Sequence, residues 1–261
     1  MIEYYDTHSH LNDASYSKGD IKDAIKNLKE YNTFTNCVAF DFDSSIMAIN
    51  FAKLYPQFFR ACVGVHPNDV YKYFNDKDFF KKFDELVKNN RKHIVAIGEI
   101  GLDSHYGDEF KKEQIEYCHK FIEIGMQYNL PIMFHIRDCF EDIKPIIQAY
   151  PNAKKIIHCF GNGIEEAEFY LKHNCVLSIS GVVTFKNAKP LHNAIKLIDL
   201  NNVMVETDAP YLTPVPFRGE KNFPHYVQYS VKEIAKLKMM DEQDVKKIVL
   251  NNAKKVFDIE L

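Results

Sequence analysis

Eight short apolar runs, each followed by a stretch with helical spacing, constrain the fold of this chain more than any other feature. The runs cover residues 2–8, 34–40, 58–65, 94–99, 131–136, 154–159, 176–180 and 203–206. They are continuous rather than alternating, which is typical of parallel strands covered on both faces. The pattern predicts an α/β fold of the (β/α)₈ barrel class, formed by residues 1–261 as one domain.

The alternative to a closed barrel is an open, doubly wound sheet, and the sequence after the first run argues against it. An open sheet would normally carry a glycine-rich phosphate turn after its first strand, and this chain has none there. Asp43 is the expected N-cap of the helix that ends near residue 55. Further helices are expected at about 20–28, 76–89, 109–129, 139–150, 163–173, 190–198, 224–238 and 241–257.

Charge and cysteine content limit the classes of function. The chain has 33 Lys and Arg against 36 Asp and Glu, a net charge of −3, which excludes a broadly basic nucleic-acid coat. A nuclease remains compatible, because metal ions and a few local cations can hold a phosphate. The six cysteines form no C-x-x-C pair and predict reduced, buried thiols in a cytoplasmic protein. Without a charged-then-apolar leader or an 18-residue apolar run, neither export nor membrane insertion is expected.

Polar side chains of one chemical kind stand at the ends of successive strands. His8 and His10 are two residues apart and share a strand face with Asp6. The others are His66 after the third run, Glu99 at the end of the fourth, His135 and Arg137 at the end of the fifth, His158 at the end of the sixth and Asp208 after the eighth. The C-terminal ends of the strands of a barrel lie at one end, so these side chains are expected to converge there. A single histidine at such a position is more often a capped or solvated residue, but so many together indicate a site.

Four histidines and two carboxylates suit two divalent ions about 4 Å apart that share a carboxylate. Histidine-rich ligand sets favour Zn²⁺ or Mn²⁺ over Mg²⁺, whereas phosphodiester chemistry often uses Mg²⁺, so the metal stays open. Asp208 could bind a metal through one oxygen and take a proton from water with the other. Arg137 suits a phosphate or carboxylate, with an ordinary surface ion pair as the alternative. Of the remaining histidines, only His105 is a possible further ligand.

Motifs along nearly the whole chain resemble the TatD family of metal-dependent deoxyribonucleases, within the amidohydrolase superfamily. They are DTHSHL at 6–11, VGVHP at 63–67, GEIGLD at 98–103, FHIRD at 134–138, HCFGN at 158–162, GVVTFKNA at 181–188 and ETDAPYLTPVPFRG at 206–219. The resemblance implies a (β/α)₈ barrel with a binuclear metal site that acts on phosphodiester bonds in DNA.

Carried over by position, the resemblance assigns roles to individual residues. The implied metal ligands are His8, His10, Glu99, His135, His158 and Asp208. Glu99 would bridge the two ions, and Asp208 would be the general base, which makes these two the catalytic candidates. His66, Arg137 and Arg218 become candidates for binding the substrate phosphate.

Some positions depart from the family pattern and affect the choice of substrate. Ser104-His105-Tyr106-Gly107 stands where aromatic residues and an arginine are usual, Gly161-Asn162 replaces Ser-Gly, and Phe217, Glu220 and Phe223 replace polar or basic residues. An amidohydrolase or esterase acting on a small molecule or an aminoacyl-tRNA ester is therefore the alternative to a nuclease. Some superfamily relatives have a carboxylated lysine at the end of the fourth strand. This chain has Glu99 there instead, and a glutamate at that position favours the nuclease. A binding protein without catalysis would be expected to lack a ligand or the base. No obligate protein partner is inferred.

Overall fold

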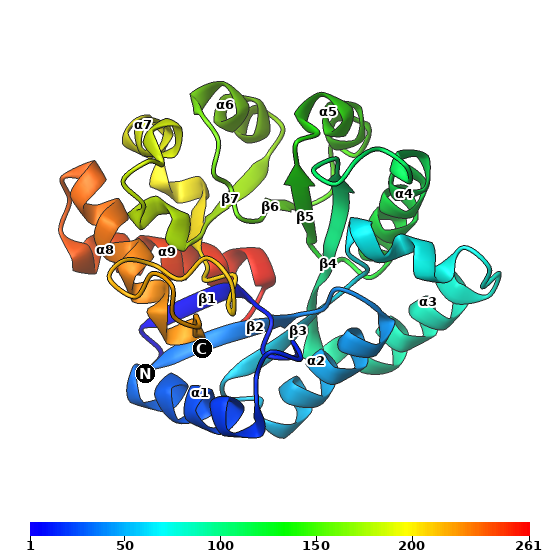
Figure 1. Ribbon diagram of the computed structural model, residues 1–261, viewed down its shortest axis with the longest axis horizontal. Coiled ribbons are helices and arrows are strands. Elements are labelled where there is room, and N and C mark those ends of the chain that lie inside the picture. The colour runs from blue at the N-terminus through cyan, green and yellow to red at the C-terminus, as the bar shows by residue number, and fades with distance from the viewer.

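The computed structural model describes residues 1–261 and shows eight parallel strands encircled by helices, as predicted (Figure 1). The strands follow chain order around the sheet. They are β1 (Tyr4–Ser9), β2 (Thr33–Val38), β3 (Phe59–Val63), β4 (Ile94–Asp103), β5 (Ile132–Arg137), β6 (Lys155–Ile157), β7 (Cys175–Ile179) and β8 (Val203–Val205). Seven of them are nearly or fully buried, because helices cover the outside of the barrel. The exception is β5, whose last three residues reach the surface at the C-terminal end.

Nine α-helices alternate with the strands, and the last two of them both follow β8. They are α1 (Lys18–Glu30), α2 (Phe42–Leu54), α3 (Phe79–Asn90), α4 (Lys111–Gln127), α5 (Phe140–Ala149), α6 (Ile164–Lys172), α7 (Lys189–Leu197), α8 (Val227–Lys238) and α9 (Glu242–Phe257). Short 3₁₀ helices are η1 (Pro67–Tyr73), η2 (Arg91–His93), η3 (Gly181–Thr184), η4 (Leu200–Asn202) and η5 (Pro224–Tyr226). None of the helices combines the length and apolar character that a membrane span requires.

Helix α2 begins differently from the prediction. Asp41, not Asp43, is its N-cap, because the Asp41 carboxylate accepts a hydrogen bond from the Ser44 amide while the Ser44 hydroxyl accepts one from the Asp41 amide. This reciprocal pair satisfies two amides at the open end of the helix. Asp43 lies inside the first turn instead.

Strand β4 is four residues longer than expected and continues past Glu99 to Asp103. Its extension pairs with β5, so that Gly101 lies opposite His135 and Asp103 opposite Arg137. Gly101 has φ +141°, and a Cβ there would collide with the carbonyl oxygen of His135. Glycine therefore lets β4 follow β5 closely up to the level of the predicted ligands.

The barrel is closed between β1 and the segment after β8 by a short polar seam. The carboxylate of Asp6 accepts hydrogen bonds from the amide and hydroxyl of Thr207 and from the hydroxyl of Thr35. The amide of Asp208 donates to the carbonyl of His8, at 2.9 Å. Asp6 thus serves this seam, whereas the sequence pattern had placed it on the same face as His8 and His10.

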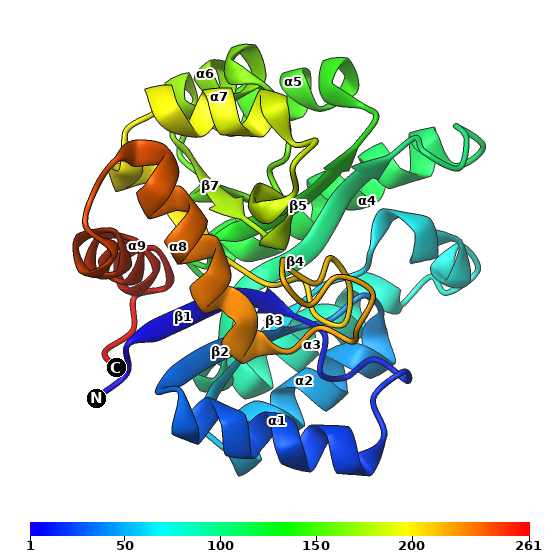
Figure 2. The ribbon, with the colours of Figure 1, turned by 60° about the vertical axis from the view of Figure 1, so that its left-hand side comes forward.

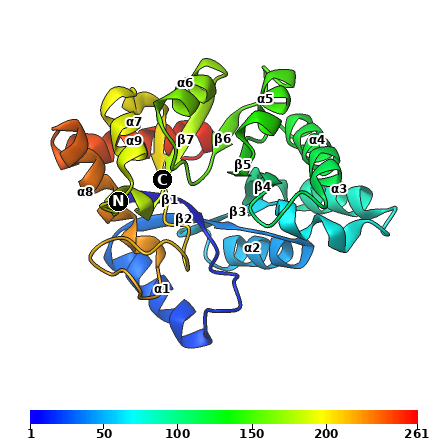
Figure 3. The same cartoon turned by 45° about the horizontal axis from the view of Figure 1, so that its top comes forward.

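The opposite end of the barrel is closed by the C-terminal residues. Phe257 at the end of α9 packs on Tyr5, with ring centroids 5.5 Å apart. It joins an apolar cluster that fills the inside of the barrel, where Met133 and Met204 are also buried. The two chain termini lie side by side near this end in all three views (Figures 1, 2 and 3).

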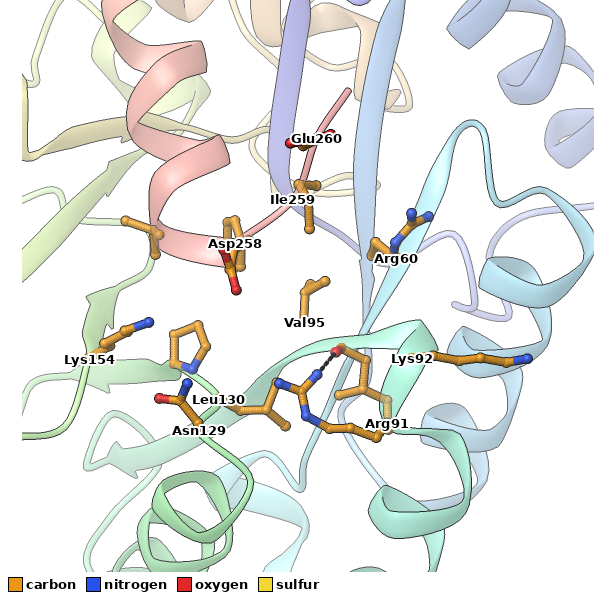
Figure 4. Close-up of a pocket in the computed structure, with 14 residues that line it drawn as sticks. Arg60, Arg91, Lys92, Val95, Asn129, Leu130, Lys154, Asp258, Ile259 and Glu260 are labelled. Carbon is orange, nitrogen blue, oxygen red and sulfur yellow. Dashed lines mark hydrogen bonds between the residues drawn. The ribbon is translucent and has the colours of Figure 1, made fainter.

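A polar pocket of about 290 Å³ lies beside this C-terminal segment (Figure 4). The Arg91 guanidinium in its wall donates to the carbonyls of Ile94 and Tyr128. Arg60 donates to the carbonyls of Pro56 and Phe59. These two guanidinium groups therefore support the backbone at the base of the barrel.

Candidate metal centre

The structure brings all six predicted ligands together at the C-terminal end of the barrel. His8 comes from β1 and His10 follows it, Glu99 lies within β4, His135 within β5, His158 follows β6 and Asp208 follows β8. Their ligand atoms form two groups, which we call the first half (His8, His10 and Asp208) and the second half (His135 and His158). Glu99 lies between them.

In the first half, the Nε2 atoms of His8 and His10 are 3.0 Å apart. Each lies close to one oxygen of Asp208, at 3.6 Å from His8 and 3.5 Å from His10. Asp208 has φ +56°, a left-handed conformation that aspartate tolerates better than most residues. This turn, together with the bond from its amide to His8, directs the carboxylate back over β1.

In the second half, Nδ1 of His135 and Nε2 of His158 are 3.3 Å apart. The Oε2 atom of Glu99 is 3.5 Å from Nδ1 of His135 and 3.1 Å from Nε2 of His158. Phe134 of β5 and Ile157 of β6 are register partners, so the residues that follow them, His135 and His158, lie at the same height. Glu99 lies at the irregularity of β4 between Ile97 and Ile100. The resulting group is compact and largely buried.

Glu99 serves both halves, because its other oxygen, Oε1, lies 3.6 Å from Nε2 of His10. Burial would raise the pKa of this carboxyl, but His66, His135 and His158 outweigh it and hold the pKa well below its usual value. Glu99 is therefore a charged carboxylate with one oxygen toward each half. The bridging role that the family resemblance implies for Glu99 stays a prediction, and it requires this placement of both oxygens.

The spacing of the ring nitrogens fits a bound cation. Two nitrogens about 2.05 Å from a tetrahedral zinc ion are separated by roughly 3.3 Å, close to the 3.0 and 3.3 Å observed. Groups of three possible ligand atoms lie within 4.8 Å of one another in both halves. His8, His10 and Glu99 could hold one ion with Asp208, and Glu99, His135 and His158 could hold a second.

The histidines also have partners for the nitrogens that face away from this centre. Nε2 of His135 lies 3.0 Å from Asp103, and Nδ1 of His158 lies 3.2 Å from Glu206. Such carboxylates fix the tautomer and orientation of a metal-binding imidazole. Nδ1 of His10 instead lies 2.9 Å from the carbonyl of Val38.

Comparison with known proteins decides the family. Residues 5–258 match the family described as TatD related DNase. The chain belongs to the TatD family. It is 40% identical to an uncharacterized metal-dependent hydrolase of Mycoplasma genitalium, with 98% of this chain and 99% of the relative covered. It is 37% identical to the uncharacterized metal-dependent hydrolase YabD of Bacillus subtilis, over 98% of this chain and 99% of that one.

Solved structures share the TatD-family fold. The crystal structure of YjjV, a TatD homologue from Escherichia coli, superposes with a TM-score of 0.91 at 21% identity, over 99% of both chains. A TatD-family hydrolase from Entamoeba histolytica gives a TM-score of 0.87 at 19% identity, over 98% of both. With its family and its ligand clusters, this chain is a metal-dependent hydrolase built on a (β/α)₈ barrel.

Carboxylates around the TatD-family centre control the protonation of its histidines. Burial opposes protonation of His10 and His158, but carboxylates outweigh it: Asp208 and Glu99 raise the pKa of His10 to about 9, and Glu206 and Glu99 raise that of His158 well above its usual value. His8 has a pKa well below its usual value, because of burial and the nearby His158. The centre thus attracts positive charge, which a divalent cation can supply in place of protons.

The three predicted phosphate-binding residues take different positions. His66 lies at the edge of the centre, with its ring centroid 4.2 Å from that of His135. Arg137 is exposed above Tyr106, 5.6 Å from the ring centroid. It makes none of the ion pairs in the structure, so the surface ion pair considered from sequence is absent. Arg218 stacks on Phe185, 3.9 Å from the ring centroid.

Asp103 and Glu206 are the residues that sequence reasoning missed. Both stand in family motifs, GEIGLD and ETD, but neither spacing nor composition separates an outer carboxylate from a ligand. His105, the possible extra ligand, instead pairs with Asp138 at 2.8 Å and is exposed.

Proposed function

We propose that this TatD-family chain is a nuclease that hydrolyses phosphodiester bonds in DNA with the help of two divalent ions. The observation that supports it is the pair of ligand clusters sharing Glu99, with Asp208 at the open side. Ions held in such a pair polarise the substrate phosphate and lower the pKa of the attacking water. Zn²⁺ and Mn²⁺ suit the imidazole ligands, and Mg²⁺ the carboxylates.

Asp208 is the proposed general base. Its side chain is 14% exposed, compared with 0% for His8 and 5% for His10 and Glu99, so it is the most accessible ligand of the first half. One oxygen, Oδ1, faces both histidines, which leaves Oδ2 to accept a proton from water. Glu99 is the other proposed catalytic residue, since it keeps the two halves at a fixed separation.

Arg137 and His66 are the proposed phosphate contacts nearest the centre. Arg137 has no carboxylate partner, and a guanidinium can donate two parallel hydrogen bonds to a phosphate. Burial, with His135 nearby, lowers the pKa of His66 to about 3, so His66 is a neutral hydrogen-bonding group. Arg218 lies farther along the loop after β8 and would contact a more distant phosphate.

The cytoplasm is the compartment we propose, because all six cysteines are unpaired and five of them are buried. The DNA substrate found there would reach the centre through the loops at the C-terminal end of the barrel. We propose no obligate protein partner for this reaction.

The test uses the purified protein, stripped of metal and reconstituted with Mg²⁺, Mn²⁺ or Zn²⁺. We expect metal-dependent cleavage of labelled single- or double-stranded DNA, and none by the metal-free protein. Metal-dependent hydrolysis of p-nitrophenyl acetate or aminoacyl-tRNA, without cleavage of DNA, would instead establish the esterase alternative.

A further inference from the structure

A basic hollow lies on the outside of the barrel, between the segment after β7 and helix α8. Its volume is about 520 Å³. The residues that line it are Thr184, Lys186, His192, Val215, Tyr229, Lys232, Glu233 and Lys236. We call this hollow the α8 groove. Figure 2 shows α8 with the loop after β8 beside its first turn.

The charge of the α8 groove is opposite to that of the whole chain. Three lysines and one glutamate line it, whereas the chain carries a net charge of −3. Glu233 pairs with Lys236 at 3.3 Å. Lys186 and Lys232 are exposed and make no ion pair. Such local cations attract a polyanion even on an acidic protein.

One loop connects this groove to the metal centre. The loop begins at Asp208, and the ring of its Tyr211 lies 6.3 Å from that of His10. Farther along, the amide of Val215 donates to the hydroxyl of Thr184 at 2.9 Å, which attaches the loop to the wall of the groove. The loop is therefore part of the rim of the centre at one end and part of the groove at the other.

Arg218 extends the row of cations along the same loop. It stacks on Phe185, next to Lys186, and its guanidinium donates to the carbonyl of Thr213. Tyr229 adds an aromatic wall to the groove, because it lies half-buried against Phe217 with ring centroids 5.3 Å apart. Cations that track a backbone, interleaved with aromatic rings, are the pattern of surfaces that bind a nucleic-acid strand.

A second basic pocket is a weaker candidate. It lies at the opposite end of the barrel, its two arginines donate to backbone carbonyls, and Asp258 and Glu260 share its wall (Figure 4). A strand held there could not continue into the metal centre, whereas a strand in the α8 groove could.

We infer that the α8 groove binds the phosphodiester backbone of the substrate strand on one side of the bond that is cleaved. This inference rests on the proposed nuclease function and specifies where the uncleaved part of the strand lies. Lys186 and Lys232 contact its phosphates, and Arg218 contacts a phosphate closer to the centre.

The test compares two double variants in an Asp208→Asn background, so that binding is measured without cleavage. Lys186→Gln/Lys232→Gln removes the unpaired cations of the groove. Lys81→Gln/Lys88→Gln is the matched control, because these lysines are also exposed, lie on α3 and make no ion pair. Fluorescence anisotropy with a labelled single strand of about 20 nucleotides, over a series of salt concentrations, gives affinity and salt dependence.

We expect the groove variant to bind roughly tenfold more weakly at low salt and to lose about 1.4 from the slope of log affinity against log salt, since each single-strand phosphate contact contributes about 0.7. The α3 control should keep the parent affinity and slope. A dinucleotide, too short to reach the groove, should bind both variants equally. Melting temperature and metal content establish that the variants are folded.

Equal affinity and slope for the two double variants would overturn the inference. It would also be overturned if the groove variant lost as much affinity for the dinucleotide as for the long strand. The proposed function is judged separately, with wild-type protein and Mn²⁺. If the wild type binds the long strand but never cleaves it, the nuclease proposal fails while the groove result stands. If it does not bind the strand at all, both fail.

Discussion

The two halves of the metal centre hold their histidines by different means. In the second half, buried carboxylates contact the outer nitrogens of both imidazoles: Asp103 that of His135, and Glu206 that of His158. In the first half, His10 meets a backbone carbonyl and His8 lies beside the sulfur of Met133. Carboxylate partners raise the basicity of an imidazole and fix its orientation. If each half holds an ion, these carboxylate partners predict tighter metal retention in the second half than in the first.

Removing Glu99 should have the largest effect, because its carboxylate oxygens lie close to histidine nitrogens of both halves. Glu99→Ala is expected to lose most of the bound metal and to reduce turnover of DNA by roughly 10⁴-fold, since the ions supply several kcal/mol to the reaction. Metal analysis and a cleavage assay test this together. Retention of two ions by Glu99→Ala would show that the halves are independent.

Asp208→Asn tests the chemistry of the first half. The change keeps one oxygen ligand and the size of the side chain but removes the proton acceptor, so kcat should fall about 10²–10⁴-fold. The melting temperature and the metal in the second half should be unchanged. The competing view is that Asp208 acts only as a ligand. Recovery of near wild-type turnover when Mn²⁺ is added to saturation would falsify its assignment as the base.

Glu206→Gln addresses the second half alone. The buried carboxylate accepts the amide of Cys159 at 2.8 Å and contacts Nδ1 of His158. Its loss should weaken one of two metal-binding steps by about 10–100-fold and leave the other unchanged, as measured by calorimetric titration of the apoprotein. Ser178→Ala, a change of similar burial one strand away, is the control. If both binding steps weaken equally, the contrast between the halves is wrong.

Arg137→Ala should have the smallest effect on the centre, because the side chain lies outside both halves. A lost charged hydrogen bond to phosphate is worth about 1.5–3 kcal/mol, or roughly ten- to a hundredfold in kcat/KM. Metal content should stay at the wild-type level, which separates this variant from Glu206→Gln. Unchanged kcat/KM on a DNA oligonucleotide would make Arg137 a structural residue, held only by its stacking on Tyr106.

The candidate ligands of both halves could be brought together from sequence because most of them lie at or just after strand ends. His8, His135 and Asp208 each stand where an apolar run stops, and in a parallel barrel those points meet. Asp103 could not be identified in this way. Its place beside His135 depends on the four extra residues of β4, which in turn depend on Gly101 approaching the backbone of His135.

Local detail was harder to predict wherever two similar residues competed. Asp41 and Asp43 lie two residues apart at the start of α2, and backbone geometry rather than residue type makes Asp41 the cap. For Arg137 the sequence likewise left two alternatives, a phosphate contact and a surface ion pair. The structure contains no ion pair of Arg137. Its phosphate contact is still a prediction.

The polar seam between β1 and the end of β8 has a consequence for synthesis of the protein on the ribosome. His8 emerges almost first, while Thr207 and Asp208, which meet it across the seam, follow about 200 residues later. At about 5–20 residues per second, that interval is roughly 10–40 seconds. Glu206, which contacts His158 of the second half, also emerges at this late point. Neither half is complete until the segment after β8 has returned to β1, so metal-dependent hydrolysis can begin only after nearly the whole chain has been made.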